Sequence, residues 1–507
     1  MRTITTRLFA VILPILAFGV MTSCTNDLDY DYGISEADLS EQPQTPHHIT
    51  LTKALENLES MMSEMGMDNT RALQRGKWTV QRVPMSAFKP HTRSDGATET
   101  GDAIYVVNFD NDEGFAILSA DDRLPDDVIA VSSRGNLIDF TPYPEEGYED
   151  TLTLEDLYVP EDDDYLLGSV TPDRVIGGLV TNYVIEWTDS IGGDLGGRFP
   201  GSPPPTPPSD PITYTYEYQT AEYIPEMLTT TWHQWPPYND QCPNRYHYKG
   251  FLGITYTTIK PYNFDAFGEW GSDFVREEDL TAGCVAIAIA QILAYNEYPA
   301  LSDVLGENVV EDWEWLLADH SAIIDPEEEA EAIARQNELY AKLVHKVGVG
   351  CDMNYGFYKQ QSFTTPAAAR RYLISLGYEN VCQYNDLLCV IDRDIVINQL
   401  RDGIPVFIGA ISGVIDGHAW VIDGYKLRCH VKTGRNSDGE IVSSEVVGTN
   451  HYVHCNWGWR NAQNNGWFTY GLFDIGEAYS YDNSNQRSVE LDYDHLFRVI
   501  TYDKPDV

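Results

Sequence analysis

The chain has 507 residues, enough for two or three domains with a large core, and 43% of them are hydrophobic, which is typical of a globular protein. It carries 78 acidic against 33 basic residues, so its formal net charge at pH 7 is -45. This balance argues against nucleic acid or an anionic membrane surface as a partner, because both are bound through clustered lysine and arginine. It suits a hydrated protein outside the cytosol.

The first residues have the pattern of an export signal. Arg2 and Arg7 precede an apolar run over residues 8–20, which is too short to cross a membrane as a helix. The small residues before Cys24 resemble the lipobox of bacterial lipoproteins, although Met21 stands where leucine is usual. An exported lipoprotein is therefore expected.

These features predict a signal peptide over residues 1–23, a lipid on Cys24, and a flexible tether over residues 24–46, which are polar and acidic. No other uncharged run reaches membrane-spanning length, so the lipid would be the only membrane anchor. Ordinary secretion with cleavage nearby is the alternative. The expected location after export is the outer membrane or the cell surface.

A small α+β domain is predicted over residues 47–140. Apolar residues recur at helical spacing over residues 49–67. Three strand-like segments follow, over residues 78–83, 103–109 and 114–119.

Residues 141–220 are predicted to be a linker. Residues 145–164 hold ten acidic residues and no basic one, which favours a solvated segment. Residues 192–211 are rich in glycine and proline, as in linkers that are stiff where proline dominates.

Residues 221–507 combine helical stretches with a later set of strand-like segments. Residues 284–296 are apolar on nearly every side, which predicts a buried helix that begins at Cys284. A helix N-terminus favours an anion, so this position would lower the thiol pKa and make the thiolate a nucleophile. A buried structural cysteine is the alternative interpretation.

The number of cysteines is consistent with a reactive thiol. The chain has eight, and removing Cys24 as a lipid site leaves seven, so at least one thiol stays unpaired in an oxidising compartment. Cys382 and Cys389 are close enough along the chain to be a candidate pair. The other pairings cannot be read from the sequence.

Two strand-like segments carry the side chains that could serve this thiol. Alternation places His418 and Trp420 on one face of the first, and His454 and Asn456 on one face of the second. A thiol needs a base for its proton, and an amide oxygen can fix the tautomer of that base. A core histidine bonded to a backbone carbonyl is the alternative.

Taken together, these segments resemble streptopain-type cysteine peptidases, a branch of the papain-like clan. The resemblance rests on the residues around Cys284, on the segments 417–424 and 454–459, and on 232–243, which is similar to the oxyanion-hole segment of that family. Residues 347–356 match the connecting motif of the family, and residues 105–123 are similar to its propeptide. Arg460-Asn461 replaces the usual glycines, and the segment 141–211 has no clear equivalent.

The resemblance implies a fold and a set of roles. It implies an α+β protein whose papain-like catalytic domain, residues 221–507, has a helical part and an antiparallel sheet and follows the small α+β propeptide domain. Cys284 would be the nucleophile and His418 the general base. Asn456 would orient His418, Trp457 would cover that contact, and the Gln234 amide would hold the oxyanion.

It also implies a secreted zymogen that hydrolyses protein or peptide substrates and needs no metal or cofactor. Its own propeptide would be the intramolecular inhibitor, removed by a cut within 141–220 that could also release the enzyme from the membrane. Three alternatives remain: a catalytically silent binding or peptidase-inhibitor lipoprotein, a related acyl transferase, and a metal site. The last would use His418, His430, His451 and His454 with Cys429 or Cys455.

Overall fold

The structure is a computed structural model of the whole chain. It describes residues 45–65, 78–88, 101–137, 140–142, 158–159, 164–165, 172–189, 212–249, 255–264, 275–358, 361–385, 393–412, 416–473 and 496–505. The predicted signal peptide, Cys24 and nearly all of the predicted tether lie outside these residues. Among the described residues, no helix combines the length and the apolar character needed to cross a membrane.

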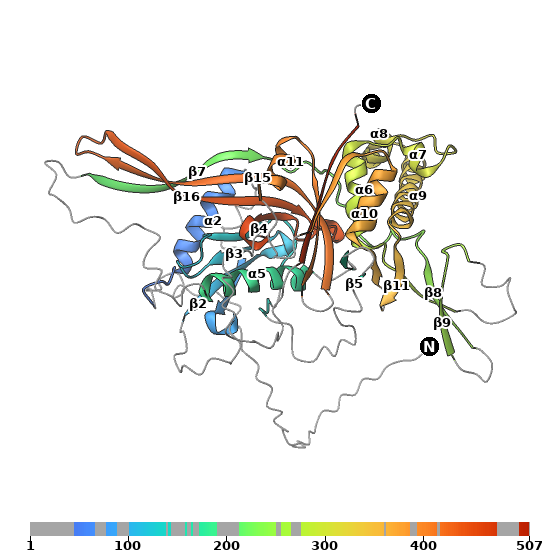
Figure 1. Ribbon diagram of the computed structural model, residues 1–507, viewed down its shortest axis with the longest axis horizontal. Coiled ribbons are helices and arrows are strands. Elements are labelled where there is room, and N and C mark those ends of the chain that lie inside the picture. Colours follow the sequence, from blue (N-terminus) through green and yellow to red (C-terminus); the bar gives the residue numbers. More distant parts are fainter. Residues whose placement is uncertain are drawn as a thin grey trace, which may run out of the picture. The chain divides into compact units, whose positions relative to one another are not determined.

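The main feature is an antiparallel sheet of eleven strands (Figure 1). Ten of them follow one another in this order across the sheet: β1 (Trp78–Pro84), β2 (Asp102–Phe109), β3 (Phe115–Ser119), β4 (Val128–Ser132), β17 (Gly466–Thr469), β16 (Ile441–Asn456), β15 (Asp416–Arg435), β14 (Val406–Ser412), β18 (Leu496–Asp503) and β13 (Glu379–Asn385). The eleventh, β7 (Thr213–Ile224), pairs with β15. The expected α+β class with an antiparallel sheet is confirmed at this coarse level.

The N-terminal strands and the C-terminal strands form one sheet because β4 pairs with β17. Val131 lies opposite Trp467 in this pairing, and Ser132 lies opposite Gly466. A side chain on Gly466 would collide with the carbonyl of Val131, so glycine permits this close approach. The predicted N-terminal domain is therefore joined to the C-terminal sheet through hydrogen bonds between backbones.

Helix α2 (Leu51–Met65) packs on the N-terminal strands. Its buried face is made by the residues that recur at helical spacing: Leu51, Ala54, Leu58, Met61 and Met62. These side chains share a core with Tyr105 and Leu118 of the sheet. The predicted amphipathic helix and the three predicted strands of this region are confirmed.

Most helices of the C-terminal part gather beside the other end of the sheet (Figure 1). They are α6 (Cys284–Asn296), α7 (Leu301–Leu305), α8 (Trp313–Leu317), α9 (Pro326–Gly350) and α10 (Pro366–Ser375). Helix α11 (Arg393–Arg401) lies apart from this group and packs on β14 and β15. Helix α6 is almost wholly buried, as its apolar sequence predicts, and it packs on α9 and β15. Helix α9 begins where the carboxylate of Asp325 accepts hydrogen bonds from the first free N–H groups.

Smaller elements complete the described chain. The strands are β5 (Tyr158–Val159) with β6 (Asp164–Tyr165), β8 (Asn244–Lys249) between β9 (Thr255–Lys260) and β10 (Val275–Asp279), and β11 (Asn354–Tyr358) with β12 (Gln361–Phe363). Short 3-10 turns are η1 (Met85–Phe88), η2 (Asp110–Asp112), η5 (His320–Ala322), η6 (Arg460–Ala462) and η7 (Tyr470–Phe473).

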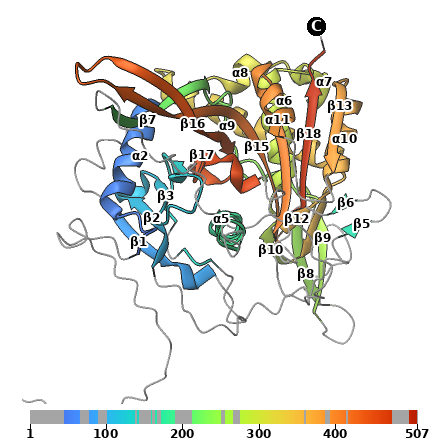
Figure 2. The same ribbon diagram turned by 60° about the vertical axis from the view of Figure 1, so that its left-hand side comes forward.

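The predicted linker contains packed structure that the sequence analysis missed. Helix α5 (Pro172–Asp189), seen end-on in Figure 2, buries Val175, Ile176, Leu179, Val180, Tyr183 and Val184 in the same core as Trp420 and Trp457. Strand β7, which begins inside the predicted linker, pairs with β15. Acidic and proline-rich stretches lie on either side of α5 and dominate the composition of 141–220. The composition of the whole segment therefore did not indicate the apolar face of this helix.

Candidate active site

Cys284 is the first residue of α6, as predicted. It follows Gly283, whose φ of +89° is in the left-handed region that glycine tolerates and other residues avoid. A side chain on Gly283 would also collide with Met353. The turn into the helix thus places the thiol where it accepts a hydrogen bond from the backbone N–H of Ala419 on β15.

Burial controls the ionisation of this thiol. The side chain of Cys284 is 2% exposed, and burial raises its pKa to about 12, although the N–H groups of Ala419, Val285 and Cys284 itself act in the opposite direction. The prediction that the helix N-terminus lowers the pKa of Cys284 is therefore wrong for this closed conformation. Desolvation of the thiolate outweighs the helix terminus.

His418 lies on β15 directly before Ala419, so it is adjacent to the residue that bonds the thiol. Its Nε2 lies 2.9 Å from the carbonyl oxygen of Trp457. A carbonyl only accepts, so Nε2 carries the proton and Nδ1 keeps the lone pair of a base. The ring is stacked on Trp459 at 5.0 Å between centroids, and it is 1% exposed. The rings of Trp457 and Trp420 are also stacked against that of His418, with their centroids farther from it than that of Trp459.

Asn456 lies at the end of β16 and is buried. Its Nδ2 donates to the carbonyl of Thr230 at 2.9 Å. Its Oδ1 accepts from Nε2 of Gln291 and from the N–H of Gly458, both at 3.3 Å. The histidine hydrogen bond predicted for the Asn456 side chain is instead seen at the carbonyl of the next residue, Trp457.

Gln234 is fully buried in the segment between β7 and β8. Its carbonyl accepts a hydrogen bond of 3.0 Å from the N–H of Ala282, two residues before Cys284. The two neighbours of Gln234 are bonded to each other, because the N–H of Trp235 donates to Nδ1 of His233 at 3.3 Å. These bonds hold the backbone of Gln234 beside the start of the helix that carries the thiol.

The structure thus buries Cys284, His418 and Trp457: Cys284 shares a core with Ala419, and His418 is stacked among the tryptophans of a second core that holds Trp457. Hydrogen bonds tie Gln234 and Asn456 to the elements that carry them. Sequence reasoning assigned no role to Gln291, Thr230 or Trp459. Gln291 could have been found, because it is an amide in the middle of an otherwise apolar stretch of α6. The sequence gives no comparable signal for Thr230.

The other histidines of the sheet have partners of their own. Nδ1 of His454 lies 2.6 Å from a carboxylate oxygen of Asp423, His451 bonds the hydroxyl of Tyr425, and His430 is stacked on Tyr218. In the part of the chain that the structure describes, no three histidine, cysteine or acidic side chains are arranged to hold a metal ion. The six described cysteines form no disulfide among themselves, and Cys389 lies outside the described residues.

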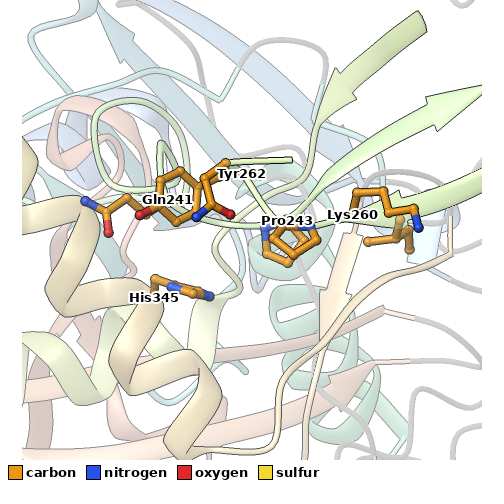
Figure 3. A pocket seen from close by; sticks show the side chains of 8 residues that line it. Gln241, Pro243, Lys260, Tyr262 and His345 are labelled. Atoms are coloured by element: carbon orange, nitrogen blue, oxygen red, sulfur yellow. The ribbon is translucent and has the colours of Figure 1, made fainter. Parts of the chain in front are cut away.

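A hollow of about 370 Å³ lies near α9 (Figure 3). Its lining residues are Gln241, Pro243, Ile259, Lys260, Pro261, Tyr262, Asn263 and His345. None of the predicted site residues lines it. The candidate active site is therefore separate from this hollow. The side chains of Cys284 and His418, which are central to the site, are buried in this conformation.

A buried thiol at a helix N-terminus, bonded to the residue that follows a histidine of fixed tautomer, combines the two groups that a cysteine hydrolase needs. Residues 232–468 match the model of the peptidase C10 family. This match contains the positions Gln234, Cys284, His418, Asn456 and Trp457.

Among curated proteins, the chain is similar to streptopain of Streptococcus pyogenes and to the streptopains of its serotypes M1 and M28. Each is 26% identical over 240 residues, which cover 41% of this chain and 51% of the relative. The chain therefore spans about half the length of the curated relatives it matches. Together with the family match, these relatives support a cysteine peptidase.

Proposed function

We propose that this protein is a secreted cysteine endopeptidase made as a zymogen. The observation that carries the proposal is the position of Cys284, at the N-terminus of α6, against the residue of β15 that directly follows His418. The thiol accepts from the N–H of this residue, Ala419, and the imidazole of His418 keeps its base at Nδ1 because Nε2 donates to Trp457. The family match and the streptopain relatives support the same chemistry.

The mechanism follows from these groups. Nδ1 of His418 takes the thiol proton, and the sulfur of Cys284 attacks the carbonyl carbon of the scissile bond. The side-chain amide of Gln234 and the N–H of Cys284 hold the oxyanion. The imidazolium gives its proton to the leaving amine as the C–N bond breaks. Water, deprotonated by His418, then hydrolyses the thioester and regenerates the thiol.

The N-terminal part is proposed to be the intramolecular inhibitor. Three observations support this: β4 extends the sheet at β17, α5 shares a core with Trp457, and Cys284 and His418 are buried. Activation would then require a cut within 141–220. Because α5 is packed and β7 is paired, we place the cut outside both.

Export, a lipid on Cys24 and release on processing belong to the same proposal, and the support for them is the sequence pattern of the first 24 residues. The test is radiolabelled palmitate fed to cells that express the chain or its Cys24→Ser variant. Radiolabel on the unmodified chain but not on Cys24→Ser supports a lipid anchor at Cys24. Equal labelling of both proteins, or labelling of neither, contradicts it.

The enzymatic proposal is tested with the chain lacking its signal and with its Cys284→Ala variant. Both are incubated under reducing conditions, and self-cleavage and the hydrolysis of denatured casein are followed. We expect only the unmodified chain to shorten within 141–220 and then to cleave casein. If both stay inert after a second protease has trimmed that region, the protein is a silent binding or inhibitor lipoprotein.

A further inference from the structure

An amide side chain is buried in the middle of α6, the most apolar helix of the described chain. Gln291 lies seven residues after Cys284 on α6, which is close to two full turns, so both side chains point to the same side of the helix. Gln291 is fully buried. A buried amide without hydrogen-bond partners destabilises the fold, so the contacts of Gln291 decide whether an amide is tolerated at this position.

Gln291 belongs to a closed circuit of hydrogen bonds among three residues, in which Thr230 takes part through its side chain and its backbone carbonyl. The hydroxyl of Thr230 donates to Oε1 of Gln291 at 2.9 Å. Nε2 of Gln291 donates to Oδ1 of Asn456 at 3.3 Å, and Nδ2 of Asn456 donates to the carbonyl of Thr230 at 2.9 Å. Each of the two amides therefore uses both its oxygen and its nitrogen.

The direction of the circuit is fixed at one point. The carbonyl of Thr230 can only accept, so the nitrogen of Asn456 must face it and the oxygen must face Gln291. Gln291 then has to present its nitrogen to Asn456 and its oxygen to the Thr230 hydroxyl. A residue at position 291 must both donate and accept to replace it.

The circuit joins the three elements on which the site depends. Gln291 is on the helix of Cys284, and Thr230 lies four residues before Gln234. Asn456 directly precedes Trp457, whose carbonyl fixes the tautomer of His418. A second anchor holds the segment of Thr230, because the N–H of Leu228 donates to Asp423 at 2.9 Å.

We propose that Gln291 is a positioning residue for the peptidase reaction: through Thr230 and Asn456 it keeps the oxyanion segment and the His418 tautomer in register with Cys284. The inference rests on the proposed function. Gln291 does not act on substrate in this scheme. Its effect on the reaction passes through Asn456 and Thr230 alone.

Two substitutions separate this role from simple packing. Gln291→Met keeps the volume and removes both hydrogen bonds. Gln291→Glu keeps a donor and an acceptor only while its carboxyl is protonated, a state that burial favours. When it ionises, the donor is lost and a negative charge faces Oδ1 of Asn456.

Asn296→Ala is the matched control. Asn296 is a buried amide on the same helix, but its nitrogen bonds the carbonyl of Ile292 and the hydroxyl of Tyr502, away from the site. The processed forms of the wild type and the three variants are compared for kcat and KM on a peptide substrate between pH 5 and 8, and for thermal unfolding.

We expect Gln291→Met to lose about 10²-fold in kcat at every pH, with KM nearly unchanged, since misplacement by about 1 Å costs that much. Gln291→Glu should match the wild type best at pH 5 and lose activity as the pH rises. Asn296→Ala should keep the wild-type kcat even where it unfolds at a lower temperature.

The outcomes separate the two proposals. An active wild type with unchanged kcat in Gln291→Met, or a Gln291→Glu variant that has already lost its kcat at pH 5, overturns the positioning role. If Gln291→Met does not fold, the kcat of Gln291→Glu at pH 5 decides alone. A processed wild type without activity overturns the proposed function and, with it, this inference.

Discussion

The imidazole of His418 donates its Nε2–H to the backbone carbonyl of Trp457 at 2.9 Å. The group that fixes the tautomer of the base is therefore a main-chain atom, which no side-chain substitution removes. Asn456, directly before Trp457, acts on the base by holding that stretch of backbone. This arrangement makes the role of Asn456 measurable as a loss of positioning.

Replacing Asn456 by alanine should lower kcat by about 10²-fold and leave KM nearly unchanged, because the backbone of Trp457 loses its anchor while no substrate contact is removed. The variant also leaves the carbonyl of Thr230 and Nε2 of Gln291 without their partner, so the free energy of unfolding should fall by about 1–3 kcal/mol. Steady-state kinetics and denaturant unfolding give the two values. An unchanged kcat would show that Asn456 has no positioning role in the site.

The raised pKa of Cys284 predicts slow alkylation in the uncut chain. With a pKa of about 12, almost all of this thiol is protonated at pH 7–8, and the thiolate is the reactive form. Iodoacetamide should therefore label Cys284 slowly in the uncut chain, and rapidly after processing opens the site. Peptide mapping by mass spectrometry gives the rate at this one position.

The exposed thiol of Cys382 is the internal control for this experiment, since it should react at the same rate in both forms. Fast labelling of Cys284 in the uncut chain at pH 7 would contradict the closed site. So would equal rates for Cys284 before and after the cut.

Glu64 of α2 links the N-terminal part to two buried cations of β15. Its carboxylate accepts from Arg428 at 3.1 and 3.2 Å and lies 3.3 Å from Nζ of Lys426, and neither cation is exposed. Replacing Glu64 by glutamine removes this negative charge from both cations, although Asp127 still lies 3.7 Å from Arg428, and breaking a buried pair costs about 3–5 kcal/mol. We expect a loss at the lower end of this range, because Glu64 itself is 20% exposed.

The loss should depend on pH. Burial tends to raise the pKa of Glu64, but the hydrogen bond and charge of Arg428, with Thr220 and Lys426, outweigh it and lower that pKa below 4.5. The stability from Glu64 is thus present above about pH 4.5 and is lost as the pH falls through the lowered pKa. Urea unfolding of the wild type and Glu64→Gln should converge there. A constant difference down to pH 3 would contradict this.

Tyr183 fixes α5 through a buried acid. Its hydroxyl donates to Oδ2 of Asp126 at 2.8 Å, and Thr469 donates to the same oxygen at 2.8 Å. Burial raises the pKa of Asp126, and these hydrogen bonds, with one from Asn450, act in the opposite direction. Tyr183→Phe removes one donor, so the folded protein should lose about 1–3 kcal/mol at pH 8.

The same substitution should cost less at acidic pH. A raised folded-state pKa means that ionised Asp126 is disfavoured in the fold, and each donor matters most to the ionised form. The difference in the free energy of unfolding between the wild type and Tyr183→Phe should therefore become smaller as the pH falls below the pKa of Asp126. A gap that widens on acidification would show that the donor does not act on this carboxylate.

The local patterns of the sequence predicted the elements that carry the site. The apolar run 284–296 and the periodic residues of α2 identify helices because burial on one or all sides leaves a repeat in the sequence. Strand β15 was predicted for the same reason, although it continues to Arg435, beyond the predicted segment. Periodic patterns of this kind can be recognised in a single sequence.

Three features could not be predicted in this way. Pairing of β4 with β17 joins residues more than 300 positions apart, and alternation within a strand does not show its neighbour. The thiol pKa depends on how deeply Cys284 is buried, which outweighs the helix terminus. The partner of His418 is a main-chain carbonyl, which every residue has, so no residue type marks it.

The central claim is that Cys284 forms a thioester with the acyl part of the substrate. The processed chain, its Cys284→Ala variant and its His418→Ala variant are mixed with a peptide p-nitrophenyl ester, quenched in acid and mapped by mass spectrometry. We predict the acyl mass on the peptide that contains Cys284 in the wild type, none in Cys284→Ala, and much slower formation in His418→Ala. Ester turnover without an adduct on Cys284, or with equal turnover in Cys284→Ala, would contradict the claim.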